Sequence, residues 1–336
     1  MNFHKDVNGE TMSTSSAVKV PRKATKASQE RARTKASNKL QDRKSYVWFL
    51  LPGFLLFAGL VGLAFVWNIV LSFMKYSGVG TPRFIGFTNY VNLFQDPVFW
   101  ESFLHAIMFI GAMSIVPTFL GLFIGALIFD YVAPRFGNGA SSFLRGALYM
   151  PQIVPLTITG IMWVWLLDPS TGVINTFLRN IGSSAQPNWL GDANLAFWSV
   201  SVIMVWVQIG YTIVVLMSGM ARLDPSLSEA AQIDGANWFQ RFRVITIAQL
   251  GPEIGVVLLT TTVAALKVFA PIYVMTGGGP GTATQVPAYF SYAEFFNNHR
   301  VGYGAAIATV LAIVLTILAI VILYVQTRQN EGANKR

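Results

Sequence analysis

The chain has 336 residues, of which 53% are hydrophobic and only 12% are charged, and its net charge is +9. Soluble proteins average about 25% charged residues, so this composition, with a mean hydropathy of +0.51, excludes an ordinary soluble globule and indicates a membrane protein. The absence of Cys excludes zinc sites with Cys ligands, iron–sulfur clusters and thiol nucleophiles, and three His are too few for a convincing metal site.

The first 45 residues form a basic segment with eleven Lys or Arg, four Asp or Glu and no apolar periodicity. This composition is typical of a disordered tail, which we expect on the cytoplasmic side. Two roles stay open: a solvated tail that enforces topology, or a tail attracted to anionic lipid headgroups. Nucleic-acid binding is disfavoured because Phe3 is the only aromatic side chain there that base stacking would use.

Six apolar stretches follow, and each is long enough for a helix of about 20 residues to cross the hydrocarbon core. The first is longer than the apolar core of a signal peptide, so we interpret it as a span. The sequence therefore predicts an all-α polytopic membrane protein with six transmembrane helices. These spans are residues 46–73, 103–129, 146–167, 194–221, 254–275 and 303–327.

The orientation follows from the basic residues, because Lys and Arg are retained on the cytoplasmic side during insertion. With the N-terminus inside, the cytoplasmic segments hold 19 Lys and Arg, and the outer segments hold four, namely Lys75, Arg83, Arg179 and Arg300. Both ends of the chain, including a C-terminal tail at residues 328–336, are therefore predicted in the cytoplasm.

The longest cytoplasmic loop, residues 223–250, predicts a helical hairpin. Asp224 is suited to cap a first helix, Pro225 fits its first position, and Gly235 favours the left-handed conformation that ends it. The first helix is thus predicted from Pro225 to Asp234.

A second short helix of the hairpin begins with a capping-box-like pair, Asn237 and Gln240. The aromatic and aliphatic residues that follow recur at helical spacing, so we expect one apolar face made by Trp238, Phe239, Phe242 and Ile245.

The hairpin sequence EAAQIDGANWFQRFRVI, residues 229–245, resembles the EAA loop of binding-protein-dependent ABC importers. In that family the loop forms the coupling helices that sit in a cleft of the cytoplasmic ATPase. The resemblance implies an ATPase-coupling role for Glu229, Ala230, Ala231, Asp234, Gly235, Ala236, Phe239 and Phe242. One departure is Ala248, since the family usually has Pro near this position and the chain has Pro252 farther on.

Three further segments resemble the carbohydrate branch of these importers: FIGFTNYVNLFQDPVFW (residues 84–100), PQIVPLTITGIMWVWLLDPSTGVIN (151–175) and VFAPIYVMTGGGPGTAT (268–284). In the last segment Ala270 stands where many relatives carry Asp. The resemblance implies the type I ABC importer permease fold in a bacterial cytoplasmic (inner) membrane. It also implies a second, non-identical permease subunit, two ATPase subunits that bind ATP and Mg, and an extracytoplasmic sugar-binding protein, with no cofactor in this chain.

Polar residues within the predicted spans are candidates for a substrate pathway. Lys267 would cost about 2.5–3.5 kcal/mol at the bilayer centre, so it either lines a pathway or extends to the outer headgroups. Gln208, Tyr211 and Thr212 share one helical face, where they either contact a sugar or form interhelical hydrogen bonds. With Tyr273, the predicted pathway set is Gln208, Tyr211, Lys267 and Tyr273.

The chain carries no motif of an enzyme. It has no Walker A sequence, no H-E-x-x-H and no G-x-S-x-G, and its TGGGPG segment lacks the Lys of a phosphate loop. The resemblance therefore implies a permease subunit for a di- or oligosaccharide, and the missing Walker A sequence implies that partner subunits hydrolyse the ATP. A secondary transporter would need intramembrane acids, which the predicted spans lack, and a membrane scaffold would need no hairpin.

Overall fold

The computed structural model describes residues 48–333, with side chains described through residue 324, so the predicted tail at residues 1–45 lies outside the described residues. The chain divides into two units, Met1–Ala64 and Phe65–Arg336. In the first unit the described residues are helical throughout and include η1 (Ala58–Gly62). Their large apolar side chains are exposed, as expected for a helix that faces lipid.

The second unit begins with the end of α2 (Leu63–Ser72) and a short hairpin. In this hairpin β1 (Met74–Lys75) pairs antiparallel with β2 (Arg83–Phe84), and α3 (Thr88–Gln95) follows. Asp96 then caps α4 (Pro97–Ile110), since its Oδ1 accepts a hydrogen bond of 2.9 Å from the Val98 N–H.

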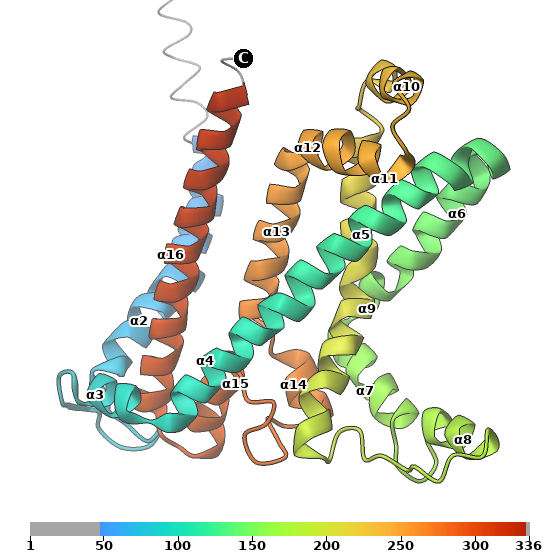
Figure 1. Ribbon diagram of the computed structural model, residues 1–336. Coiled ribbons are helices and arrows are strands. Elements are labelled where there is room, and N and C mark those ends of the chain that lie inside the picture. Colours follow the sequence, from blue (N-terminus) through green and yellow to red (C-terminus); the bar gives the residue numbers. More distant parts are fainter. Residues whose placement is uncertain (1–47, 334–336) are drawn as a thin grey trace, which may run out of the picture. The chain divides into compact units, whose positions relative to one another are not determined.

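The second and third predicted spans form one helical run that reverses direction at a glycine. The run consists of α4, η2 (Gly111–Ile115), α5 (Val116–Leu127), η3 (Ile128–Val132) and α6 (Ala133–Ile153). Gly137 has φ 77° and ψ 171°, which breaks the helix so that α6 runs back in the opposite direction (Figure 1).

The third predicted span, 146–167, is broken rather than continuous. Its residues belong to the end of α6 and to α7 (Leu156–Leu166), because Val154 is extended and Pro155 precedes α7. Pro cannot donate a backbone hydrogen bond and restricts the residue before it, which accounts for the break.

The remaining elements are three long helices, α9, α13 and α16, and the short elements that connect them. They are α8 (Val173–Asn180), α9 (Ala193–Met220), α10 (Pro225–Ile233), α11 (Trp238–Arg241), η4 (Phe242–Thr246), α12 (Ile247–Gln249), α13 (Gly251–Leu266), α14 (Ala270–Met275), α15 (Pro287–Tyr292), η5 (Ala293–Asn297) and α16 (Val301–Ala333).

The fifth predicted span, 254–275, is wrong at both ends. Helix α13 begins at Gly251 and stops at Leu266, with Lys267 as its C-cap. The helix stops because Pro271 lacks an N–H and its ring would clash with the carbonyl of Lys267 in a continued helix.

Four helices between residues 48 and 333 are long and apolar enough to cross a membrane, and a pair bent by 72° at residue 250 raises this number to five. Helix α7, with 11 residues, is too short to count. The prediction of six spans is thus supported in its helical and polytopic character, and the number six stays a prediction.

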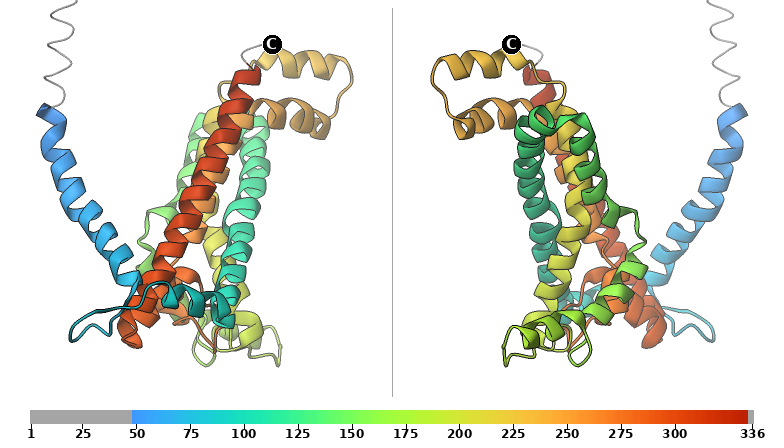
Figure 2. Two further views of the ribbon diagram at one scale, coloured as in Figure 1. Left: turned by 90° about the vertical axis from the view of Figure 1, so that its left-hand side faces the viewer. Right: turned by 90° about the vertical axis from the view of Figure 1, so that its right-hand side faces the viewer.

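Helix α9 lies at the centre of the second unit, packed against α5, α6 and α13 (Figures 1 and 2). Close approach needs small residues: a methyl group at Gly210 would lie only 2.6 Å from the Cα atom of Tyr149. The hairpin α10–α12 and the end of α16 lie at one end of this unit, and α3, α8 and the start of α16 lie at the other.

Candidate functional site

Helix α10 is bounded at both ends by local features of the backbone and its caps. Asp224 caps α10 by accepting a hydrogen bond of 2.9 Å from the Ser226 N–H, and this bond holds the pKa of the Asp224 carboxyl below its usual value. Gly235 has φ 83°, the left-handed conformation that the sequence predicted. Helix α10 ends at Ile233, one residue before the predicted end, because Asp234 is already its C-cap.

The second helix starts with the predicted capping box. The side chain of Asn237 accepts a hydrogen bond from the Gln240 N–H at 2.9 Å, and the Gln240 side chain accepts one from the Asn237 N–H at 2.8 Å. At the base of the hairpin an ion pair between Arg222 and Glu253 joins the end of α9 to the start of α13. The hairpin is therefore a closed, capped unit.

The inner face of the hairpin is fastened to η3, the segment that follows α5. The Trp238 indole N–H donates a hydrogen bond of 2.8 Å to the carboxylate of Asp130. The Trp238 ring stacks on Phe242, with centroids 5.2 Å apart and planes 9° from parallel. Phe242 is buried and Ile245 is half-buried, so these side chains fix the hairpin against the second unit.

The predicted apolar face is wrong for Phe239, whose side chain is 60% exposed. Trp238, Phe242 and Ile245 are four and three residues apart and share one side of the helix, whereas Phe239 is about 100° away from Trp238. Phe239 is instead exposed, as are Ala230, Ile233 and Val244. We define these four residues, together with Glu229, as the outer hairpin face; Glu229 is exposed as well and also lines the cavity described below. Of the other predicted coupling residues, Asp234 and Gly235 are exposed, and Ala231 and Ala236 lie beside them at the turn.

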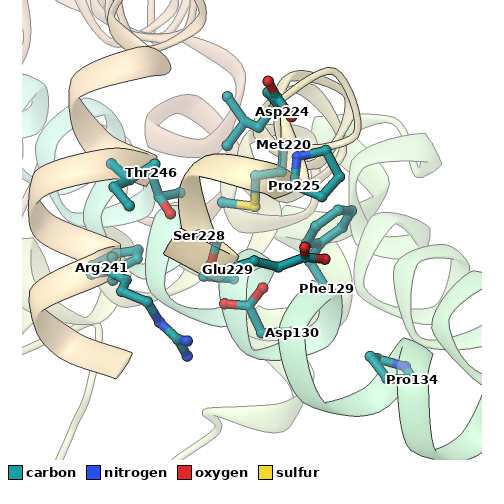
Figure 3. A pocket seen from close by; sticks show the side chains of 14 residues that line it. Phe129, Asp130, Pro134, Met220, Asp224, Pro225, Ser228, Glu229, Arg241 and Thr246 are labelled. Atoms are coloured by element: carbon teal, nitrogen blue, oxygen red, sulfur yellow. The ribbon is translucent and has the colours of Figure 1, made fainter. Parts of the chain in front are cut away.

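A cavity of about 390 Å³ lies between the hairpin and η3 (Figure 3). Glu229, Asp130 and Arg241 all line it, and in the figure the guanidinium group of Arg241 points away from the two carboxylates. Among the described residues neither Glu229 nor Arg241 has an ion-pair partner within the chain. Their charges are therefore available to a group from outside.

Two of the four predicted pathway residues meet in a second cavity. Gln208 and Lys267 both line this cavity, whose volume is about 350 Å³, together with Phe269. Most of its lining is apolar, and we call it the polar cavity after the polar side chains that it contains. Gln208 is only 8% exposed, and among the described residues its side chain has no hydrogen-bond partner. An amide that faces a cavity without a partner in the chain favours a polar occupant of this cavity.

The sequence analysis missed Gln152, which lines the same cavity. Its side-chain oxygen is buried and has no hydrogen-bond partner in the described part of the chain. The sequence could have indicated Gln152 as a pathway residue, because a polar amide side chain between Pro151 and Pro155 is unusual in an apolar span.

The other two predicted pathway residues lie elsewhere. The Tyr211 hydroxyl lies 3.0 Å from the Thr260 hydroxyl, which is the interhelical hydrogen bond that the sequence left open. Tyr273 is half exposed and stacks on Phe269, with centroids 5.6 Å apart. It belongs to an aromatic cluster with Tyr289 and Tyr292 that adjoins the polar cavity through Phe269.

Comparison with known protein families gives one match that covers most of the second unit. Residues 119–330 match the family described as binding-protein-dependent transport system inner membrane component. The matched region includes the whole hairpin, Asp130 and every residue of the polar cavity except Met113.

Similar curated proteins are permeases. A probable ABC transporter permease protein of Pyrococcus horikoshii is 32% identical over 292 residues, which is 86% of this chain and 98% of that protein. The trehalose/maltose transport system permease protein MalF of Thermococcus litoralis is 33% identical, over 72% of this chain and 79% of the relative. The sulfoquinovosyl glycerol transport system permease protein SmoG of Agrobacterium fabrum is 31% identical over 86% of this chain and 92% of the relative.

A solved structure has the same fold. A chain of a bacterial ABC transporter involved in the import of the acidic polysaccharide alginate superposes with a TM-score of 0.73, covering 86% of this chain and 99% of that chain. Its sequence identity is 22%, so the likeness concerns the fold. The expected ABC importer permease fold is thereby confirmed.

Proposed function

We propose that this chain, which belongs to the family of binding-protein-dependent transport system inner membrane components, is the permease subunit of a sugar importer driven by ATP hydrolysis on partner subunits. It would form half of the translocation path and carry no ATPase motif of its own. The observation that carries the proposal is the outer hairpin face, because it is exposed, built on a rigid hairpin and placed at one end of the helical unit.

The outer hairpin face has the composition of a docking surface for a protein. Ile233 is 87% exposed and Val244 is 70% exposed, so the face offers apolar area that water solvates poorly. Ala230 permits close approach of a partner backbone, and the unpaired carboxylate of Glu229 would attract a basic group there. The partner we propose is the cytoplasmic ATPase subunit.

Asp130 is the proposed positioning residue of this coupling. Its hydrogen bond to Trp238 ties the hairpin to η3, and α5, just before η3, packs along α9. A movement of the hairpin would therefore be transmitted to α9, which carries Gln208 at the polar cavity.

The polar cavity is the proposed part of the sugar path in this subunit. Sugars present hydroxyl groups and apolar ring faces, which fit the amides of Gln152 and Gln208, the ammonium group of Lys267 and the Phe269 ring. Several relatives are named for sugar transport, which supports a di- or oligosaccharide. A similar structure was obtained in complex with an alginate pentasaccharide-bound periplasmic protein, which supports an extracytoplasmic binding protein as a partner. We further propose a second, non-identical permease subunit and a bacterial cytoplasmic membrane location.

The coupling proposal is tested with two glycines that have nearly the same backbone conformation. Gly235 has φ 83° and Gly182 has φ 84°, and at neither residue would an added Cβ have another atom within 4 Å. Gly235→Val and Gly182→Val therefore carry the same local strain at opposite ends of the unit. In the reconstituted full complex, we expect Gly235→Val and Glu229→Lys to abolish uptake and the ATPase activity stimulated by the binding protein. Gly182→Val should retain both, and wild-type stimulation in the Gly235 and Glu229 variants would reject the coupling role.

The proposed orientation has its own test. Reporter fusions at residue 180, the last residue of α8, should lie outside, and fusions at residue 235 should lie inside. The reverse placement at either site would contradict the proposed topology.

A further inference from the structure

A basic pocket is formed by elements at the end of the second unit opposite the hairpin, where α3 and the start of α16 lie (Figure 1). It is a cavity of about 670 Å³ between the β1–β2 hairpin, α3 and the start of α16. The basic residues that line it are Lys75, Arg83, His299 and Arg300. Three of the four Lys and Arg predicted in outer segments are thus gathered at one place, and only Arg179 lies elsewhere.

Acidic groups of the chain neutralise only part of this charge. Arg300 forms an ion pair of 3.1 Å with Glu294 and lies over the Tyr303 ring, 4.2 Å from its centroid. Within the described residues Lys75 and Arg83 have no ion-pair partner. The pocket therefore keeps two uncompensated cations.

The strand register makes this arrangement unfavourable without an anion. Lys75 on β1 is the direct cross-strand partner of Arg83 on β2. Like charges directly opposite each other destabilise a strand pair. An anion bound between them would turn this repulsion into attraction.

The start of α16 adds to the positive potential. This helix of 33 residues begins at Val301, and its first turn adjoins the pocket at Gly302. The N-terminal end of a helix carries a partial positive charge. Gly302 permits the approach, because a methyl group there would overlap the carbonyl oxygen of Met74.

Exposed apolar side chains beside the pocket, which we call its apolar rim, distinguish between possible sources of the anion. Val79, which lines the pocket, is 87% exposed, and Phe84 and Phe87, in and after β2, are 71% and 70% exposed. Tyr76 and two of the basic residues of the pocket follow the end of an apolar helix, an arrangement typical of the membrane–water interface. Lys75 follows the last residue of α2 by three positions, so the pocket lies just beyond the end of an apolar helix, where we expect the lipid headgroups.

We propose that the basic pocket binds the phosphate group of a membrane phospholipid, with Lys75 and Arg83 as its ligands and the apolar rim against the acyl chains. A bound headgroup would hold β1, α3 and the start of α16 together at the outer surface. The site is separate from the polar cavity and from the hairpin, and it does not depend on which sugar is carried.

Lipid binding is measured on the full chain in its purified complex, in detergent. The probes are phosphatidylglycerol, a diacylglycerol glycolipid without phosphate, and inorganic phosphate. Native mass spectrometry should show phosphatidylglycerol retained by the wild type, with at least a tenfold weaker apparent affinity in Lys75→Gln/Arg83→Gln. Arg179→Gln is the matched control, because Arg179 is the one Lys or Arg of the predicted outer segments that lies outside the pocket, and it should bind within twofold of the wild type.

The unfolding temperature, measured with and without lipid, distinguishes a loss of lipid binding from a loss of folded protein. Without lipid, the double variant should unfold at the wild-type temperature or above it, because the cross-strand repulsion is gone. Phosphatidylglycerol should raise the unfolding temperature of the wild type and of Arg179→Gln, but not that of the double variant.

Four results would overturn the proposal. Wild-type retention of phosphatidylglycerol by the double variant would exclude these residues as ligands. Equal retention of the glycolipid would assign binding to the apolar rim alone, and equal stabilisation by inorganic phosphate at the same concentration would assign the site to a free anion. If the double variant bound lipid as the wild type does but bound the extracytoplasmic protein more weakly, the pocket would be a protein docking site.

Discussion

The hairpin and the polar cavity differ in how far apart their residues lie in the sequence. The hairpin is shaped by hydrogen bonds between neighbours, such as Asp224 with Ser226 and Asn237 with Gln240. The cavity joins Gln152, Gln208 and Lys267, which come from three separate helical segments. A locally built element keeps its shape when the rest of the molecule changes, whereas a cavity built from distant segments depends on every helix contact around it.

The largest effect is expected where helix packing supports the cavity. Gly210→Ala would place a methyl group against the backbone of α6, 2.6 Å from the Cα atom of Tyr149. Overpacking of this kind costs typically about 1–3 kcal/mol, and backbone has little room to yield. We expect loss of folded protein, measured as a lower yield and unfolding temperature in detergent. Gly111→Ala, which meets no atom within 4 Å, is the control and should retain the wild-type values.

A second substitution tests whether the function of the hairpin depends on its hydrogen bond to η3 or only on the hydrogen bonds within the hairpin. Asp130→Ala removes the acceptor of the Trp238 indole N–H without touching the turn. We expect stimulated ATPase activity to stay while uptake per ATP falls about tenfold, because the docked hairpin would no longer move with η3. Asp130→Asn retains an oxygen acceptor and should recover most of the uptake. Equal uptake in both variants and the wild type would show that the hydrogen bond has no part in coupling.

A smaller effect is expected inside the cavity. Lys267→Ala and Gln208→Ala should lower uptake several-fold, measured with radiolabelled sugar in proteoliposomes, and leave stimulated ATPase activity near the wild-type value. Tyr211→Phe is the comparison, because its hydroxyl contacts Thr260 rather than the cavity. Unchanged uptake in Lys267→Ala would mean that this ammonium group serves only to reach the headgroups.

The smallest effect concerns the cap of α10. Because its hydrogen bonds hold the pKa of Asp224 below the usual value of about 3.9, the ionised cap stabilises α10 above that pH and the stabilisation is lost as pH falls below it. Amide exchange of Ser226 should therefore become faster, relative to its intrinsic rate, as the pH falls below about 4. In Asp224→Asn, which retains an acceptor but does not titrate there, this extra acceleration should be absent.

The sequence predicted the hairpin almost completely because its determinants are local. The cap, the left-handed glycine and the capping box each involve residues at most three apart, and all three are confirmed. Phe239 was wrongly assigned to the apolar face of the second hairpin helix, because spacing alone does not show which apolar side chains face the rest of the protein. Trp238 lies inside because η3 supplies Asp130, a partner 108 positions away that no local pattern shows.

The residues of the polar cavity were predicted only in part, because the cavity forms where two helices are interrupted, after Ile153 and after Leu266. Gln208 and Lys267 were found as polar residues in apolar stretches, and Gln152 was missed between two prolines. The end of α13 at Leu266 was not predicted, although Pro271 is its physical cause. The break places Lys267 at a helix end beside the cavity rather than within a continuous span.

Helix α9 joins these two regions mechanically. It runs unbroken for 28 residues, or about 42 Å, with Gln208 near its middle and the cap of the hairpin four residues beyond its end. Small residues at its contacts, including Gly210 and Gly219, hold neighbouring helices against it. If α9 tilts as a rigid rod about the contacts near its centre, a tilt that draws its hairpin end inward moves its opposite end outward. The two mouths of the path would then open in alternation without any bending of the helix.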